Sequence, residues 1–185
     1  YNLTVTDNNN CYRDFNIALV EPNEFLASAT SYDVSCFQEN DGSIASSFSG
    51  GTGPYTSFLM DDAQQFLSSA DSVLNLSSSQ YYLFGQDDNG CYSDTIILSV
   101  QEPSPINISV NNITDLICNN VPDGSISIDA FGGTGVLSYQ WLGPNNFIQS
   151  GQSINQLFAG IYNVSVIDEN NCIETSVSYT HLTLP

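Results

Sequence analysis

The sequence has almost no positive charge. Lysine and arginine together occur once, as Arg13, against 20 aspartates and glutamates, so the formal net charge is −19. Nucleic acids and anionic membrane surfaces are bound by clusters of basic side chains, which this chain cannot supply. The composition therefore excludes nucleic acid as a partner and argues against anionic membrane surfaces, whereas the excess of carboxylates allows cations to bind.

Histidine and long apolar runs are equally scarce. His181 is the one histidine, and no run of 18 apolar residues occurs, so we expect no membrane-spanning segment. Because Ser–His–Asp triads and many metal sites need imidazole, we predict a chain that is not an enzyme and has no catalytic residues. Hydrophobic residues still make up 41% of the sequence and aromatic residues 11%, which is typical of a folded domain and not of a disordered acidic tail.

A pattern of about 81 residues repeats along the chain. "DGSI" occurs at Asp41–Ile44 and at Asp123–Ile126, and "GGTG" occurs at Gly50–Gly53 and at Gly132–Gly135. A fixed long period indicates an array of similar units. We expect the C-terminal part of one repeat at 1–22, a complete repeat at 23–103 and a further repeat at 104–176. Because the sequence starts inside a unit, we also expect it to be a piece of a longer protein.

The repeats have the sequence pattern of β-structure. Apolar and polar residues alternate in Ser43–Phe48, Ser125–Phe131 and Gly160–Asp168, as expected for strands with one buried face. Clusters such as "DNNN", "DDNG" and "DENN" are typical of turns. Short strands with turns every eight to twelve residues favour an all-β fold, with tandem immunoglobulin-like β-sandwich repeats of about 80 residues.

Several residues are predicted to have structural roles. The glycines of the two "GGTG" segments fit tight turns, because glycine adopts positive φ without steric cost; a phosphate-binding loop is the alternative. Trp141 fits the core, with stacking on a sugar as its alternative. Tyr81 and Tyr162 fit core positions, or corner tyrosines whose hydroxyls bond the backbone. The six glycines are Gly50, Gly51, Gly53, Gly132, Gly133 and Gly135.

The five cysteines follow the repeat and indicate disulfides formed in an oxidising compartment. The simplest pairing stays within a unit and joins Cys36 to Cys91 and Cys118 to Cys172, with the partner of Cys11 outside the sequence. In an immunoglobulin-like sandwich, however, these cysteines would lie at opposite ends. A bridge between neighbouring units, such as Cys36–Cys172, or free thiols are therefore the alternatives.

Acidic turns offer two candidate cation sites. A weak calcium site is considered at Asp87, Asp88 and Asn89, and at Asp168, Glu169 and Asn170, because calcium prefers carboxylate and carbonyl oxygens. The alternative is a solvated turn in which these side chains cap their own backbone. No other cofactor is expected.

The last nine residues, Val177–Pro185, differ in character from the repeats. They read as the translation of sequencing-adapter DNA, so we expect an artefactual tail at 177–185 and a last repeat without its native final strand. Without this tail the chain would contain no histidine at all.

Two segments resemble a known family. "C…DGSI…GGTGPY", from Cys36 to Tyr55, and "AGIYNVSVIDENNC", from Ala159 to Cys172, are similar to the SprB repeat of large surface adhesins in gliding Bacteroidetes. The resemblance implies secretion to the cell surface and a non-catalytic role as stalk or adhesive surface in attachment or gliding motility. The partners that it implies are neighbouring repeats of the same chain and surface glycans or proteins. A carbohydrate-binding or spacer module of a secreted multidomain enzyme is the alternative.

Overall fold

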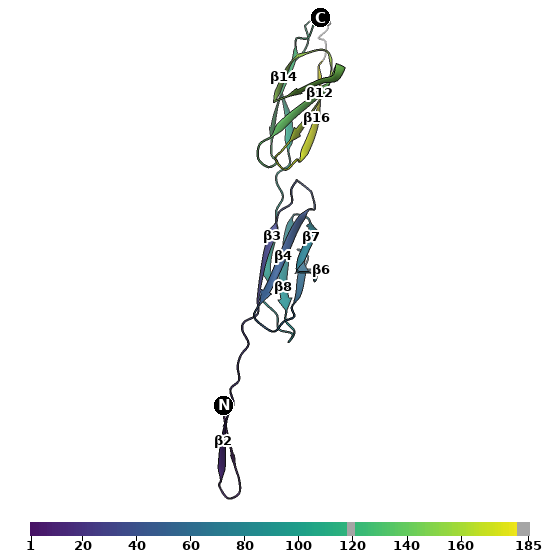
Figure 1. Ribbon diagram of the computed structural model, residues 1–185. Helices are drawn as coiled ribbons and strands as arrows, with labels where there is room; N and C mark the ends of the chain where they lie inside the picture. Colours follow the sequence, from purple (N-terminus) through teal and green to yellow (C-terminus); the bar gives the residue numbers. More distant parts are fainter. Residues whose placement is uncertain (118–120, 181–185) are drawn as a thin grey trace.

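A computed structural model describes residues 1–117 and 121–180, with the backbone alone for residues 179 and 180. Figure 1 shows three bodies in a row: a two-stranded hairpin and two β-sandwiches that follow each other end to end. None of the described segments forms a helix that is long and apolar enough to cross a membrane. The prediction of an all-β fold with tandem immunoglobulin-like sandwiches is confirmed.

The first sandwich contains seven antiparallel strands in two sheets. The three-stranded sheet has the order β3-β4-β7 and the four-stranded sheet the order β6-β5-β8-β9. The strand bounds are β3 Leu26–Tyr32, β4 Gly42–Ser49, β5 Thr56–Met60, β6 Phe66–Ser68, β7 Ser72–Leu76, β8 Ser79–Gln86 and β9 Ile96–Val100.

The second sandwich repeats this topology. Its sheets have the orders β10-β11-β14 and β13-β12-β15-β16. The bounds are β10 Asn107–Thr114, β11 Gly124–Phe131, β12 Ser138–Gly143, η1 Pro144–Asn146, β13 Phe147–Ser150, β14 Ser153–Leu157, β15 Gly160–Ile167 and β16 Ile173–Thr180. Gln101–Ile106 form the linker between the sandwiches.

Each sandwich has its own core, built from the inward residues of alternating strands. In the first sandwich the core includes Leu59 and Leu83, and in the second it includes Trp141 and Val164. The two pairs are equivalent in register, since Leu59 lies opposite Leu83 as Trp141 lies opposite Val164. The two buried clusters share no residue, so each sandwich has the packing of an independent domain.

The N-terminal hairpin pairs β1 Asn2–Thr6 with β2 Tyr12–Asn16. It corresponds to β8 and β9 of the first sandwich, because Tyr1, Asp7 and Cys11 repeat as Tyr81, Asp87 and Cys91. All of its strand residues are exposed. The boundaries proposed from the sequence, 1–22, 23–103 and 104–176, place this hairpin and the two sandwiches in separate units.

The second sandwich has a final strand that runs into the expected tail. β16 continues beyond residue 176 and pairs with β15 along its full length, up to Thr180 opposite Gly160. A final strand is therefore present, because ladder pairing uses backbone groups that any residue except proline provides. The artefactual origin of residues 177–185 stays a prediction, and His181 lies outside the described residues.

Candidate functional site: the junction between the sandwiches

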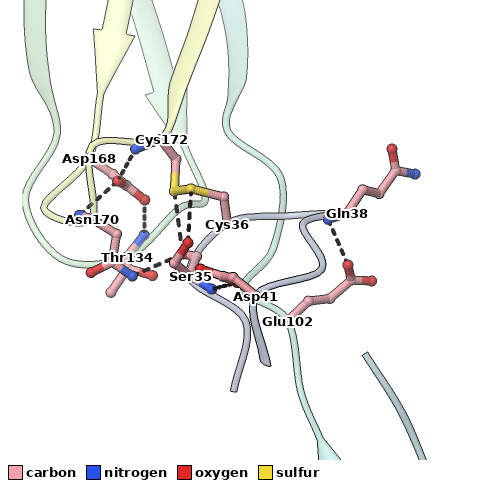
Figure 2. The surroundings of a disulfide bond; sticks show 9 residues. All are labelled: Ser35, Cys36, Gln38, Asp41, Glu102, Thr134, Asp168, Asn170 and Cys172. Atoms are coloured by element: carbon pink, nitrogen blue, oxygen red, sulfur yellow. Dashed lines mark hydrogen bonds between the residues drawn. A yellow bond between two sulfur atoms is a disulfide. The ribbon is translucent and has the colours of Figure 1, made fainter. Parts of the chain in front are cut away.

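A disulfide joins the two sandwiches at their junction. Cys36 lies on the loop after β3 in the first sandwich, and Cys172 lies in the β15–β16 turn of the second. Their Cα atoms are 5.7 Å apart, within the range that a disulfide requires. Figure 2 shows the bridge together with the hydrogen bonds around it.

The within-unit pairing predicted from the sequence is therefore wrong for Cys36 and Cys172. Cys36 follows β3 at the end of the first sandwich that faces the linker to the second, whereas Cys91 lies in the β8–β9 turn at the opposite end. A strand of eight residues separates the two ends by roughly 26 Å, which no disulfide spans. Cys91 and Cys11 are exposed free thiols, and Cys118 lies outside the described residues.

The loop of residues 33–41 carries Cys36 and is the cysteine loop of the first sandwich. Carboxylates hold this loop in shape. Asp41, the first residue of "DGSI", accepts a hydrogen bond from the Ser35 backbone N–H at 2.8 Å. Hydrogen bonding from the Ser35 side chain, and next from this backbone N–H, lowers the pKa of Asp41. The Gln38 N–H donates to Glu102 of the linker at 2.8 Å, so the loop is also tied to the chain that leads into the second sandwich (Figure 2).

Polar contacts cross the junction beside the disulfide. The side-chain amide of Asn170 donates to the Ser35 carbonyl oxygen at 2.9 Å, and the Sγ atom of Cys172 lies 3.4 Å from the same oxygen. A hollow next to the bridge is lined by residues of the loop, the linker and the turn: Cys36, Phe37, Glu39, Pro105, Ile106, Asn171, Cys172, Ile173 and Glu174. The junction thus combines a covalent bond with specific polar contacts.

The turn that carries Cys172 is organised by Asp168. Its Oδ1 accepts the N–H groups of Asn170 and Cys172, both at 2.9 Å, and its Oδ2 accepts the N–H of Thr134 at 2.8 Å. The carboxylate therefore fixes the turn and attaches it to the "GGTG" segment. Asp168 is 5% exposed, so these bonds replace the water that burial removes.

The first sandwich contains the same arrangement around Asp87. Its Oδ1 accepts the N–H groups of Asn89 at 3.0 Å and Cys91 at 2.8 Å, and its Oδ2 accepts the N–H of Thr52 at 2.9 Å. Hydrogen bonding to the charged form, above all from Cys91, lowers the pKa of Asp87.

In the structure, three of the residues predicted to bind calcium accept hydrogen bonds from backbone N–H groups. The carboxylates of Asp87 and Asp168 bind backbone N–H groups, and Glu169 accepts a further N–H from Val136 at 3.2 Å. Within residues 1–117 and 121–180, no group of three or more His, Cys, Asp or Glu side chains is arranged to hold a metal ion. Calcium binding at Asp87, Asp88 and Asn89, or at Asp168, Glu169 and Asn170, stays a prediction.

The "GGTG" segments connect each turn to the chain that enters the sandwich. Gly50 and Gly132 have φ of 74° and 95°, and a Cβ atom at either position would overlap a backbone carbonyl, that of Glu24 or of Pro105. The next N–H groups are also engaged, since Gly51 donates to Asn23 and Gly133 donates to Ser104, both at 2.9 Å. Glycine is thus required by positive φ and by a close backbone approach.

The remaining glycines and aromatic residues of interest are buried or lie in turns. Tyr81 and Tyr162 are almost fully buried, and their hydroxyls donate to the carbonyl oxygens four residues earlier, at 2.9 Å and 3.1 Å. Burial raises the pKa of Tyr162.

Trp141 is fully buried and its Nε1 donates to the Gly151 carbonyl at 2.9 Å, so its ring offers no face to a sugar. Gly53 precedes a cis proline, and Gly135 has a φ of 71°.

Sequence reasoning missed two groups of residues. Ser35 and Gln38 shape the junction through backbone groups, for which a sequence pattern gives no signal, and Glu102 accepts the Gln38 N–H through its carboxylate. It also missed a row of aromatic rings on the outer face of the sheet β6-β5-β8-β9 in the first sandwich. Phe58 stacks on Phe84 with ring centroids 5.1 Å apart, and the row continues to Phe66 at 6.3 Å and to Tyr92 at 6.0 Å. Alternation in β5 and β8 could have indicated these outward rings.

Both sandwiches contain a segment that matches a known family. The family model of the SprB repeat matches residues 28–56 and 110–146. The two segments are equivalent, since each includes most of the first strand, the "DGSI" strand and the "GGTG" turn. The resemblance predicted from the sequence is thereby confirmed. No curated protein matches the chain.

The chain is similar to several solved structures. The three N-terminal domains of the outer capsid protein Hoc of bacteriophage RB49 match with a TM-score of 0.54 and 16% identity, over 85% of this chain and 59% of that one. A C-terminal fragment of intimin, solved in complex with the intimin-binding domain of its receptor Tir, has a TM-score of 0.40, 16% identity and coverages of 87% and 64%. The Ig1 and Ig2 domains of DIP-gamma have a TM-score of 0.40, 10% identity and coverages of 85% and 97%. The likeness to Hoc supports the tandem immunoglobulin-like fold.

Proposed function

We propose that this chain, with an SprB repeat segment in each sandwich, is a non-catalytic repeat region of a secreted bacterial cell-surface adhesin. It would serve as stalk, adhesive surface or both, in attachment or gliding motility. The observation that carries the proposal is the covalent junction: Cys36 and Cys172 join two sandwiches that already follow each other end to end. A fixed joint between rod-like units suits a structure that projects a surface away from a cell.

An extracellular location fits the same observation. Disulfides persist in oxidising environments such as the periplasm and the cell surface, and are rare in the cytosol. The family match supports this location as well, because SprB repeats are found in surface adhesins. The high negative charge, −19 over 185 residues, keeps neighbouring copies apart through mutual repulsion.

The test uses antibodies raised against the whole oxidised chain, applied to cells of the source bacterium. The proposal expects labelling of intact cells that disappears after proteinase K treatment, whereas labelling only after permeabilisation would overturn it. Monovalent antibody fragments then separate the two roles. If they block attachment to glass or gliding, the repeats form the adhesive surface; if they label the surface without effect, the repeats form the stalk.

A carbohydrate-binding module is the second candidate, and one observation favours it. The aromatic row of Phe66, Phe58, Phe84 and Tyr92 covers an outer sheet face, and its two end rings are 57% and 62% exposed. Contiguous exposed rings with polar surroundings are a common basis for ligand recognition. The second sandwich has Gln140 and Ser165 at the positions of Phe58 and Phe84, so the row belongs to the first sandwich.

A glycan array probed with the whole chain tests this candidate. Binding that is lost in a Phe66→Ala, Tyr92→Ala double variant would support it. The matched control is Leu74→Ala, an exposed apolar residue on β7 in the other sheet, which should leave binding unchanged. No binding to any glycan, or equal binding by the double variant, would exclude the aromatic row as a sugar site.

A further inference from the structure

We propose that Cys91 accepts the cysteine loop of another repeat placed ahead of it and forms with it a disulfide equivalent to Cys36–Cys172. Disulfides would then join each repeat to its neighbour and would not close any single repeat. The inference concerns how repeats connect, so it holds or fails independently of adhesion and of the cell-surface role.

The first argument is the equivalence of the two turns. Cys91 and Cys172 each donate their N–H to an aspartate Oδ1, at 2.8 Å and 2.9 Å. In each turn the aspartate N–H donates to the cysteine carbonyl, at 2.9 Å from Asp87 and 3.1 Å from Asp168. The two cysteines are therefore presented by the same backbone geometry, and one of them is bonded to the preceding sandwich.

The second argument is the surface around Cys91. A hollow at this end of the first sandwich is lined by Glu21, Pro22, Asn23, Glu24, Phe25, Leu26, Gly51, Asp87, Cys91, Tyr92 and Asp94. In this hollow, Cys91 and Tyr92 are equivalent to Cys172 and Ile173 at the junction between the sandwiches. Glu24 and Phe25 are likewise equivalent to Pro105 and Ile106. At that junction, Cys36, Phe37 and Glu39 of the preceding sandwich complete the lining.

The third argument is the polar group that crosses the junction. Asn170 donates its side-chain amide to Ser35 of the preceding sandwich at 2.9 Å. Its counterpart Asn89 donates to Thr52 of its own sandwich at 2.9 Å. The Asn89 amide is exposed and needs only a change of acceptor to bind an incoming loop in the same way.

The chain that enters the first sandwich also has the features of the linker. Glu102 and Pro103 of the linker recur as Glu21 and Pro22. Glu102 accepts the N–H of Gln38 and so holds the cysteine loop of the preceding sandwich. Glu21, which lines the hollow beside Cys91, is in position for the same role.

The bond would form by thiol oxidation. Two thiols, one on Cys91 and one on the incoming loop, release two protons and two electrons as the S–S bond forms. A disulfide oxidant accepts them; with oxidised glutathione, its own S–S bond breaks and two molecules of glutathione thiol are released.

The experiment inserts a second copy of residues 23–103 between Pro22 and Asn23 of the whole chain. Both splice points follow a Glu-Pro pair, so the new connection repeats a sequence that the chain already has. In this longer chain, Cys36 of the first copy faces Cys91 of the second. A Tyr92→Phe substitution in the second copy marks its Cys91 by mass. The chain is oxidised with glutathione, free thiols are alkylated, and peptides are mapped with and without reduction.

We expect Cys91 of the second copy to be bonded to Cys36 of the first copy, while Cys91 of the first copy is alkylated. The Cys36–Cys172 bridge in the same molecule shows that folding and oxidation have succeeded. In a control with Cys36→Ser in the first copy only, the marked Cys91 should become alkylated. If the marked Cys91 of the second copy is alkylated in the long chain that keeps both Cys36 residues, although the Cys36–Cys172 bridge has formed, the proposal is overturned.

Discussion

Ser178 lies opposite Tyr162 in the same register in which Leu98 lies opposite Tyr81. Leu98 packs in the core of the first sandwich. Ser178 is 5% exposed, and its hydroxyl has no hydrogen-bond partner. In the same strand, Ile173 and Val177 face solvent, as Tyr92 and Ile97 do at the equivalent positions of the first sandwich. The serine at a core position of β16 supports the prediction that residues 177–185 are not native to the repeat.

Replacing Ser178 with valine should therefore stabilise the second sandwich. The substitution removes a buried hydroxyl without a partner and adds apolar contact, which together should raise the free energy of unfolding by about 1–3 kcal/mol. Urea denaturation followed by the fluorescence of Trp141, the one tryptophan, measures this sandwich alone. The control Thr175→Val, on the exposed side of β16, should change stability by less than about 0.5 kcal/mol. Destabilisation by Ser178→Val would show that the position is already filled.

Trp141→Ala should strongly destabilise the second sandwich. The ring is fully buried and donates one hydrogen bond to Gly151, so truncation leaves a cavity and a carbonyl without its partner. The expected loss is about 3–5 kcal/mol, measured by circular dichroism during chemical denaturation. Leu142→Ala, at a neighbouring position that is 46% exposed, is the control and should have a much smaller effect. Equal losses for the two variants would argue against a core role for the indole.

Asp87→Asn should reduce the stability of the first sandwich and change its response to acid. The pKa of Asp87 is lowered from its ordinary value of 3.8 because the carboxylate accepts N–H groups, first of all that of Cys91. A lowered pKa in the folded state means that the stabilisation is present above the ordinary value. It is lost as the pH falls below 3.8 through the folded-state pKa.

The measurement is thermal unfolding as a function of pH. The asparagine variant should melt earlier at neutral pH and should lose less stability than the unsubstituted chain on acidification. Asp88→Asn removes the same charge from the next position, which is exposed, and should leave the melting temperature close to that of the unsubstituted chain. If the two variants behave alike, net charge and not the hydrogen bonds of Asp87 explains the effect.

Loss of the junction disulfide should free the two sandwiches from each other without unfolding them. Each has its own core, so a Cys36→Ala, Cys172→Ala double variant should keep its circular dichroism spectrum. Proteolysis within Gln101–Ile106 should become faster, and small-angle X-ray scattering should show a broader distribution of distances. The chain-entropy model of disulfides predicts that the free energy of unfolding both sandwiches is lower in the double variant by up to about 5 kcal/mol. Cys91→Ser is the control and should change none of these results; an unchanged linker cleavage rate in the double variant would contradict the prediction.

The fold could be predicted because its signals are local and occur more than once. Alternation of apolar and polar residues indicates the strands, and the repeated "DGSI", "GGTG" and Asp–Cys spacings align the two sandwiches with each other. The pairing of Cys36 could not be deduced in the same way. It depends on which end of a sandwich each loop reaches, and the simplest count along the chain joins Cys36 to a cysteine at the wrong end.

The contacts at the junction were even harder to predict from the sequence. Asn170 could be recognised as a repeated turn residue, but its acceptor is the carbonyl oxygen of Ser35, 135 residues away. Every residue type has a backbone carbonyl, so an acceptor of this kind leaves no pattern in a sequence. The strand β16 shows the opposite limit, since backbone pairing extends it through Ser178, whose side chain does not fit the core.

The position of the Cys36–Cys172 bridge determines how the molecule would respond to tension applied at its ends. The covalent path from residue 36 to residue 172 is a single S–S bond, although the two residues are 136 apart in sequence. Pulling can therefore straighten only the residues outside that interval. Fully extended, the enclosed segment would measure about 450 Å, and this length stays unavailable even if both sandwiches unfold. An oxidised pair of repeats is thus nearly inextensible, and reduction of one bond would convert it into a long, compliant tether.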